Sequence, residues 1–238
     1  IYLIPSYKRG SKLLPTVQML RSFGCNREQI IVSTQTKDDY EEYTENMSED
    51  CTVIYREGHN VAMNRNTLLL YMQEHGEQSA WMLDDDIRAL EVVVSDKISR
   101  PLTKEEFFAT FGYLEKVCRD HNISLCGIYP IANPLFAQSK DKLDTTLIGT
   151  VLGIFDNTLC FNEEYAIKED FELCLRIISQ GGHTFRKSRL FARAGHKTKG
   201  GCEEHWEKDE IYTLKLIEQY PDLVKYSKSR KSHIQLLF

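Results

Sequence analysis

The stretch Trp81-Met82-Leu83-Asp84-Asp85-Asp86-Ile87 decides how this chain is interpreted. Its apolar half predicts a buried strand, and its acidic half places carboxylates at the carboxyl end of that strand, where open α/β sheets bind ligands. Asp84 and Asp86 are two positions apart, so in an extended chain they face the same way. Closely spaced carboxylates repel one another, and a hard divalent cation relieves that repulsion. The stretch therefore indicates a metal site, with a solvated acidic turn as the alternative.

The residues before this stretch alternate short apolar runs with helical patterns. Strands are expected at 2–5, 29–33, 51–56 and 80–83, and helices at 11–22, 39–46 and 62–74. Such alternation predicts an α/β fold with a mainly parallel central sheet flanked by helices.

The remaining residues predict further elements of both kinds. Strands are expected at 123–129, 145–155 and 183–193, and helices at 103–119, 168–179 and 203–219. Thr103 and Glu106 have the spacing of a capping box at a helix start. A long loop is expected over 130–144, and loops of that length in compact domains are often functional. With no repeat or linker in the sequence, we expect one domain over 1–238.

Composition narrows the class of protein. The chain has 238 residues, which fits one sizeable domain, and no apolar run long enough to cross a bilayer. Its seven cysteines are scattered without a CxxC pair, so we expect most to be reduced core thiols in an intracellular, cytoplasmic protein. The net charge of −5 gives no global sign of nucleic-acid binding, although Lys and Arg crowd 186–199 and 225–231.

Four features that can carry chemistry follow one another along the chain. A loop, Pro5-Ser6-Tyr7-Lys8-Arg9-Gly10, follows the first strand, and Asn60-Val61-Ala62-Met63-Asn64-Arg65-Asn66 opens the helix before the acidic strand. The acidic triplet is third. The fourth is Lys168-Glu169-Asp170-Phe171-Glu172 at a helix start, with Arg193-Ala194-Gly195-His196 after the next strand.

This order resembles glycosyltransferases of the GT-A fold, a fold related to the Rossmann fold, whose metal motif is DxD. The resemblance implies a nucleotide-sugar-binding half over 1–90 and an acceptor and catalytic half over 91–238. It implies donor contacts from the residues Pro5, Ser6, Tyr7, Arg9, Asn64, Arg65, Asp84 and Asp85. It further implies that Asp84, Asp86 and His196 bind the metal, with His205 competing for the third place, and that Glu169 and Asp170 supply the catalytic base.

The chemistry of sugar transfer suits these side chains. A divalent cation stabilises a departing diphosphate as a Lewis acid. Asp84 and Asp86 suit Mg²⁺ or Mn²⁺, and a His ligand favours Mn²⁺. Asp170 can take the proton of an acceptor hydroxyl that lies within hydrogen-bond reach.

Each residue also has a plainer interpretation. Glu169 and Asp170 are typical first-turn acids of a helix, and Asn64 to Asn66 are typical of helix capping. Lys8 and Arg9 fit solvated loop charges, and His196 fits a loop residue without a ligand role.

Among proteins of that fold, the sequence around Asn64-Arg65-Asn66 and the acidic stretch resembles that of the TET/JBP-associated glycosyltransferases and related phage enzymes. The resemblance implies a UDP-sugar donor, a hydroxymethylpyrimidine base in DNA as acceptor, and a cytoplasmic, phage-in-host or nuclear protein. A DNA acceptor needs nearby cations. The candidates are Lys187, Arg189, Arg193, Lys197 and Lys199, with a second run at Lys225, Lys228, Arg230 and Lys231. A solubilising surface is the alternative for both groups.

A DNA acceptor raises the question of how its base reaches the site. Base flipping would let Tyr129 or Phe136 stack on the base, although both also fit a core role. Two other functions remain open from the sequence. One is a GT-A enzyme that acts on a polysaccharide, lipid or protein, and the other is a non-catalytic nucleotide-binding module.

Overall fold

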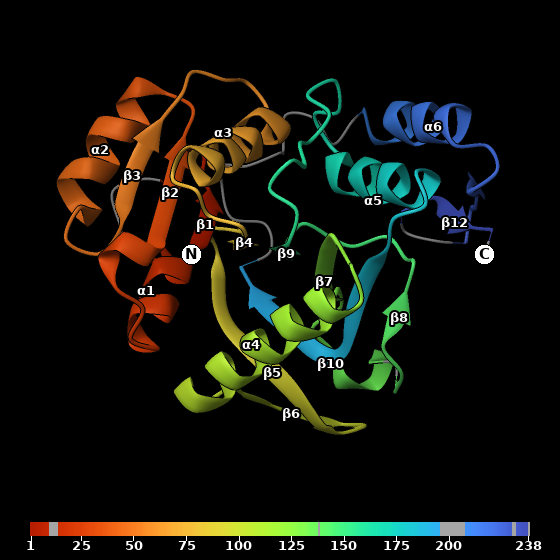
Figure 1. Ribbon diagram of the computed structural model, residues 1–238, viewed down its shortest axis with the longest axis horizontal. Coiled ribbons are helices and arrows are strands. Elements are labelled where there is room, and N and C mark those ends of the chain that lie inside the picture. Colours follow the sequence, from red (N-terminus) through yellow and green to blue (C-terminus); the bar gives the residue numbers. More distant parts are fainter. Residues whose placement is uncertain (10–13, 138, 196–207, 230–231, 238) are drawn as a thin grey trace.

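The computed structural model describes residues 1–9, 14–137, 139–195, 208–229 and 232–237 (Figure 1). Its first half contains β1 (Tyr2–Pro5), α1 (Pro15–Ser22), η1 (Arg27–Gln29), β2 (Ile30–Thr34), α2 (Lys37–Met47), β3 (Thr52–Tyr55), α3 (Val61–Glu74) and β4 (Ala80–Leu83). Its second half contains β5 (Ile87–Ser95), β6 (Ile98–Pro101), α4 (Lys104–Asp120), β7 (Leu125–Tyr129), η2 (Pro134–Phe136), β8 (Lys142–Leu143), β9 (Val151–Ile154), α5 (Glu169–Ser179), β10 (Thr184–Ala194), α6 (Asp209–Gln219), β11 (Val224–Tyr226) and β12 (Ile234–Leu236).

Ten of the described strands form one sheet in the order β3-β2-β1-β4-β9-β7-β10-β5-β6, with β8 paired to β10. β1 pairs in parallel with β2 and β4, β2 with β3, and β10 with β7. β9 joins β4 and β7 with antiparallel pairing, and β5 is antiparallel to β10. The predicted α/β fold is confirmed, and antiparallel strands join its two parallel parts.

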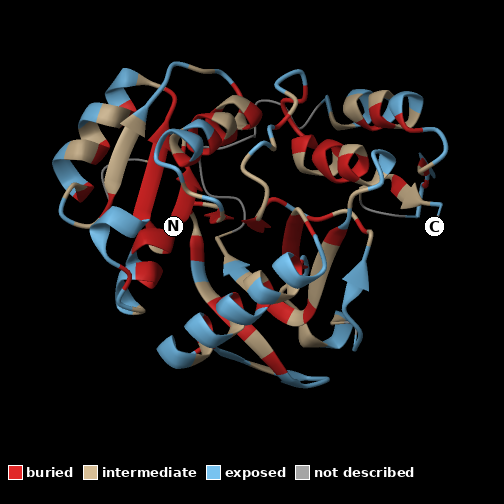
Figure 2. Cartoon of the chain, viewed as in Figure 1, coloured by how far each residue is buried: buried red, intermediate tan, exposed pale blue. Residues whose placement is uncertain are grey.

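The sheet separates two apolar cores because neighbouring residues of a strand point to opposite faces. Tyr2 and Ile4 of β1 enter one core together with residues of α1 and α4. Leu3, between them, enters the other core together with residues of α3 and α5. β1, β2 and β4 are therefore buried along their whole length, as Figure 2 shows for β1 and β2. This explains their continuous apolar sequences, which are typical of strands covered on both faces.

The strand order creates a switch point at β1. The chain runs from β1 outward through β2 to β3 and then returns to place β4 on the other side of β1. Loops leaving the carboxyl ends of β1 and β4 therefore diverge and leave a crevice between them, which is where open α/β sheets bind ligands. The loop after Pro5 and the acidic turn after Leu83 both open onto this crevice.

Most predicted elements of the first half agree with the structure to within two residues. The sequence analysis missed the antiparallel hairpin of β5 and β6 and the small hairpin of β11 and β12. Only 151–154 of the strand expected at 145–155 forms, and the last helix begins at Asp209 within the described residues. The loop expected at 130–144 contains the short elements η2 and β8.

Core predictions can be checked directly. Trp81 is buried between Phe111 and Phe155, at ring-centroid distances of 4.3 and 5.7 Å, which confirms its core role. The six cysteines within the described residues are free thiols; five are buried and Cys160 is exposed. Among the described residues, no helix combines the length and apolar character that crossing a bilayer requires.

Gly153 in β9 provides a test of this packing. A Cβ atom there would lie 2.8 Å from Cys126 Sγ, Phe155 Cζ and Trp81 Cζ3, so the core would have to shift. We expect Gly153→Ala to lower the free energy of unfolding by about 1–3 kcal/mol in urea titrations. Gly112 is the matched control because it is exposed in α4 with open space around it, and Gly112→Ala should raise stability by about 0.5–1 kcal/mol. Equal effects of the two substitutions would contradict the packing described here.

Candidate active site

A polar cavity of about 200 Å³ occupies the switch point. It is lined by Pro5, Ser6, Tyr7, Arg9, Gln35, His59, Asn60, Val61, Asn64, Arg65, Asp84, Asp85, Asp86 and Glu169. All eight residues expected to contact the donor line this cavity, together with Asp86 and Glu169. Their gathering brings together segments that are more than 80 residues apart in the sequence.

The acidic triplet forms a turn between β4 and β5. Thr16, at the start of α1, fixes this turn: its Oγ1 donates to Asp84 O at 2.5 Å and accepts from Ile87 N at 2.9 Å. The side chains of Asp84 and Asp86 are 36% and 20% exposed, whereas that of Asp85 is 6% exposed. The two outer carboxylates thus share the cavity, as expected, although the backbone between them turns and is not extended.

Asp85 points inward and holds the loop after β1. Its Oδ2 accepts hydrogen bonds from Ser6 Oγ at 2.7 Å and from Arg9 Nε at 3.0 Å. Tyr43 of α2 completes the network through its hydroxyl, which lies 3.0 Å from Ser6 Oγ and accepts from Arg9 N at 3.1 Å. Burial raises the pKa of Asp85 to about 6, against the opposing effect of Arg9. Arg9 is therefore an ion-paired residue of the cavity wall and not a solvated loop charge.

The residues of α3 have distinct tasks. Asn60 caps the helix, since its side chain accepts from Met63 N at 2.9 Å. Asn64, one turn later, donates to Ser6 O at 2.9 Å and accepts from Ser33 Oγ at 2.5 Å, so it joins β1 to β2. Helix capping is therefore the role of Asn60 and not of Asn64.

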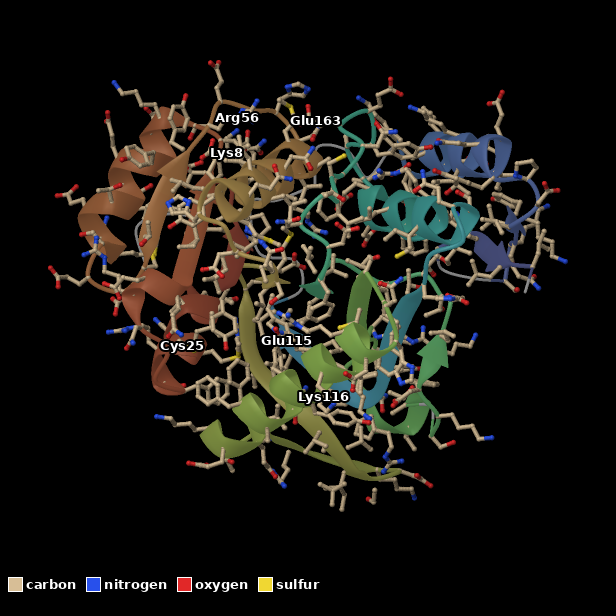
Figure 3. The ribbon with its side chains drawn as sticks, viewed as in Figure 1. Lys8, Cys25, Arg56, Glu115, Lys116 and Glu163 are labelled. Atoms are coloured by element: carbon tan, nitrogen blue, oxygen red, sulfur yellow. The ribbon has the colours of Figure 1, made fainter. Side chains whose placement is uncertain are left out.

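Asn66 faces the opposite half of the molecule. It donates to Phe161 O at 2.9 Å and accepts from Phe161 N at 2.7 Å. It also donates to Glu163, which Figure 3 labels at the margin beside α3. Lys8 is labelled at the same margin, near the carboxyl ends of the parallel strands. Asn66 is thus an anchor for the segment before α5.

Arg65 connects both halves of the site. Its buried guanidinium lies 3.3 Å from Asp84 Oδ1 through Nη2 and 3.3 Å from Glu169 Oε1 through Nη1. Nη2 also donates to Gly149 O at 3.3 Å. A Cβ at Gly149 would lie 2.2 Å from Nη1, so the guanidinium can reach the loop only because that residue is glycine.

Glu169 and Asp170 begin α5; Glu169 lines the cavity, whereas Asp170 is not among the lining residues. Asp170 accepts hydrogen bonds from Gly149 N at 2.7 Å and from Phe171 N at 2.8 Å. Burial raises the pKa of both carboxyls, and the neighbouring Arg65 opposes that rise. First-turn acids that served only the helix would stay solvated, whereas these two are tied to Arg65 and to Gly149.

The described chain leads directly from the acidic turn toward His196. Gly195 N donates to Asp86 O at 3.1 Å, so position 196 follows a residue in contact with the triplet. His196 and the competing His205 both lie outside the described residues, as do Lys197 and Lys199. Within the described residues, no three His, Cys, Asp or Glu side chains form a cluster that could hold a metal ion.

The expected basic groups are mostly ion-paired or remote. Lys187 Nζ lies 2.9 Å from Asp141, Arg193 Nε lies 2.5 Å from Glu91, and Arg189 lies 3.8 Å from Asp96. Lys225 and Lys228 are exposed near the hairpin of β11 and β12, at the edge of the molecule far from β1 and β4 in Figure 1, while Arg230 and Lys231 lie outside the described residues.

Gln35 and His59 line the cavity and were not among the sequence candidates, while Asn60 and Val61 lie in the segment 60–66 that the sequence singled out without assigning them a role. Gln35 directly follows β2. Ligands bind at the carboxyl ends of strands in open α/β sheets, so the position of Gln35 after a strand was the signal that could have identified it. His59 is exposed and also lines the cavity.

Comparison with known proteins places this chain in a class of glycosyltransferases. The family model for the TET-Associated Glycosyltransferase matches residues 1–201, so the chain belongs to that family. No curated protein matches the chain.

Several solved structures are similar in fold. S. aureus TarS 1–349 shares 14% identity and a TM-score of 0.47, over 90% of this chain and 63% of that one. A197 from STIV shares 14% identity and a TM-score of 0.42, over 82% of this chain and 86% of that one. A CMP:2-keto-3-deoxy-manno-octonic acid synthetase complexed with CTP shares 11% identity and a TM-score of 0.49, over 90% of this chain and 98% of that one. The chain thus spans less than two thirds of the TarS fragment.

The pairing of Arg65 with Glu169 is testable by a double-mutant cycle. Arg65→Met leaves the buried carboxylate of Glu169 without its guanidinium, and we expect it to lower the free energy of unfolding by about 3–5 kcal/mol. Adding Glu169→Gln should restore part of that loss, so the two effects will not add. The control pair is Arg100 and Glu106, which is exposed at 2.6 Å and should couple by about 1 kcal/mol or less. Strict additivity at Arg65 and Glu169 would refute the bridge.

Proposed function

We propose that this glycosyltransferase moves a sugar from a UDP-sugar, with a divalent cation, to a hydroxymethylpyrimidine base in DNA. The observation that carries the proposal is the cavity at the switch point, where Asp84, Asp86, Arg65 and Glu169 meet. Family membership supports the transfer of a sugar, and the charges of the cavity support the cation.

The charge balance of the cavity favours a cation. Its lining carries four carboxylates, those of Asp84, Asp85, Asp86 and Glu169, against two guanidinium groups, those of Arg9 and Arg65. A diphosphate would add further negative charge to this lining, which a divalent cation can offset. Asp84 and Asp86 provide the hard oxygen ligands that Mg²⁺ and Mn²⁺ prefer, and they are the two acids of the triplet with exposed carboxylates.

We assign the donor to the β1 side of the cavity. Pro5, Ser6 and Tyr7 would hold the nucleoside, because Asp85 and Tyr43 fix this loop in place. Arg9 and Arg65 would face the diphosphate, and a divalent cation held by Asp84 and Asp86 would supply Lewis-acid stabilisation of the leaving group. His196 is proposed as a third ligand of the cation.

We assign the catalytic base to Asp170. Both of its oxygens accept backbone hydrogen bonds, and each carboxylate oxygen retains capacity for another donor. An acceptor hydroxyl can thus donate to Asp170 without breaking these bonds. The raised pKa of this buried carboxyl makes it a stronger base than a solvated aspartate. Glu169, held by Arg65, would position the start of α5.

Donor binding is tested by thermal shift with UDP-sugars in the presence and absence of Mn²⁺. At about 100 times the Kd, we expect the wild-type Tm to rise by about 5–10 °C, and to rise far less without the cation. Asp86→Ala should remove the Mn²⁺-dependent part while the ligand-free Tm stays close to that of the wild type. Asp96→Ala, which removes an exposed acid in the turn between β5 and β6, is the control. Retention of the full Mn²⁺ effect by Asp86→Ala would contradict the assignment.

The base and the acceptor are tested by transfer assays. Asp170→Asn should lower kcat about 10²–10⁴-fold on hydroxymethylated DNA and leave the donor Kd nearly unchanged, because a base acts mainly in the transition state. Asp222→Asn, at an exposed position after α6, is the control. Near-normal turnover by Asp170→Asn would remove the base assignment. Transfer to a polysaccharide, lipid or protein, with none to hydroxymethylated DNA, would replace the acceptor.

A further inference from the structure

The loop after β7 exposes a cluster of apolar side chains. Ile131, Leu135 and Phe136 are 46%, 62% and 60% exposed, and the last two belong to η2. Tyr129, at the end of β7, is buried, so of the two aromatic candidates in this region only Phe136 is free to meet a ligand. Exposed apolar side chains that gather in one place mark an interaction surface more often than scattered ones do.

Backbone hydrogen bonds hold this tip in one conformation. Leu135 N donates to Asn133 Oδ1 at 3.0 Å and Phe136 N to Asn133 O at 3.1 Å. The Tyr129 hydroxyl donates to Phe136 O, and Pro134 restricts the backbone at the start of η2. A partner would therefore meet a pre-organised tip, which keeps the entropic cost of binding low.

A chain of contacts connects the tip to the active site. The base of the loop, Tyr129 and Pro130, lines an apolar recess of about 20 Å³ together with Ile148, Thr150, Ala192 and Ala194. Thr150 O accepts from Asp84 N at 3.0 Å, and Gly195, next to Ala194, donates to Asp86 O at 3.1 Å. The tip thus projects from the strands that border the acidic turn, on the side away from the loop after β1.

The surroundings of the tip suit a polyanion. Segments 130–150 and 183–195 contain six Lys and Arg residues and two Asp residues, and three of the basic residues, Lys187, Arg189 and Arg193, are ion-paired. Both acids are engaged internally: Asp141 accepts from Lys187 and from Ser188 N, and Asp144 lies 3.1 Å from His183. Lys140 and Lys142 remain exposed beside the tip.

We propose that Leu135 and Phe136 insert into the base stack of duplex DNA and fill the space that the target nucleotide leaves when it turns into the active site. The inference rests on the proposed function, since it requires DNA as acceptor. Enzymes that act on a base extrude it from the duplex, and apolar side chains wedged between base steps stabilise unstacked DNA. Asp170 is held in place by a hydrogen bond from the backbone of Gly149. The acceptor hydroxyl must therefore move to this carboxylate, which requires its nucleotide to leave the base stack.

The test compares one oligonucleotide, with a single hydroxymethylpyrimidine, as a single strand and as a duplex. Leu135→Ala with Phe136→Ala should lower kcat/KM on the duplex at least about tenfold and change it less than about twofold on the single strand, where no base has to be unstacked. 2-Aminopurine beside the target should gain fluorescence with the wild type and not with the variant. The control is Ile211→Ala with Leu214→Ala, which removes two exposed apolar side chains of α6.

Other outcomes would overturn the inference in distinguishable ways. Equal losses on both substrates would make the tip a general contact surface, and no loss on the duplex would remove it from DNA binding. A wild-type dimer in light scattering that dissociates in the variant would assign the tip to a second copy of the chain. Transfer by the wild type to neither form of DNA, despite donor binding, would overturn the DNA acceptor itself and the wedge with it.

Discussion

The buried guanidinium of Arg65 is the contact on which the site depends. A buried charge is tolerated only when it is paired, and Arg65 meets this demand with Asp84 from the turn after β4, Glu169 from α5 and the carbonyl of Gly149. These partners come from both halves of the chain. The pairing that stabilises the guanidinium of Arg65 therefore also sets the distance between the acidic turn and the start of α5. This arrangement requires a residue without a side chain at position 149, which is Gly149.

The acidic triplet shows how neighbouring carboxylates acquire different tasks. Asp85 is surrounded by Ser6, Arg9 and Tyr43, whereas Asp84 and Asp86 open onto the cavity. Like charges this close would destabilise the fold if all three faced one space. Turning the middle carboxylate inward, against Arg9, separates it from the outer two and at the same time fixes the loop after β1. One turn therefore shapes the cavity wall and leaves two carboxylates for a cation.

The general location of the site followed from the sequence because it depends on a local rule. Each buried strand has its own carboxyl end, and parallel neighbours bring those ends to one edge, so the residues after Pro5 and Leu83 were expected to meet, whereas Arg65 was assigned to the donor by the family resemblance. What the sequence did not reveal depends on contacts between distant residues. The inward direction of Asp85 requires Arg9 and Tyr43, and the anchoring of Asn66 requires Phe161. The β5–β6 hairpin was not predicted, because no element was assigned to the residues between the acidic triplet and Thr103.

The antiparallel half explains how the chain returns to the acidic turn. β10 pairs with β5 up to Arg193, where a register shift follows. Bulges of this kind bend a strand and re-aim the residues beyond it, and they are frequent next to active sites. Here the residue after β10, Gly195, meets Asp86, which lies at the start of β5. The bend after β10 thus brings Gly195, the last described residue before the gap at 196–207, into contact with the acidic turn.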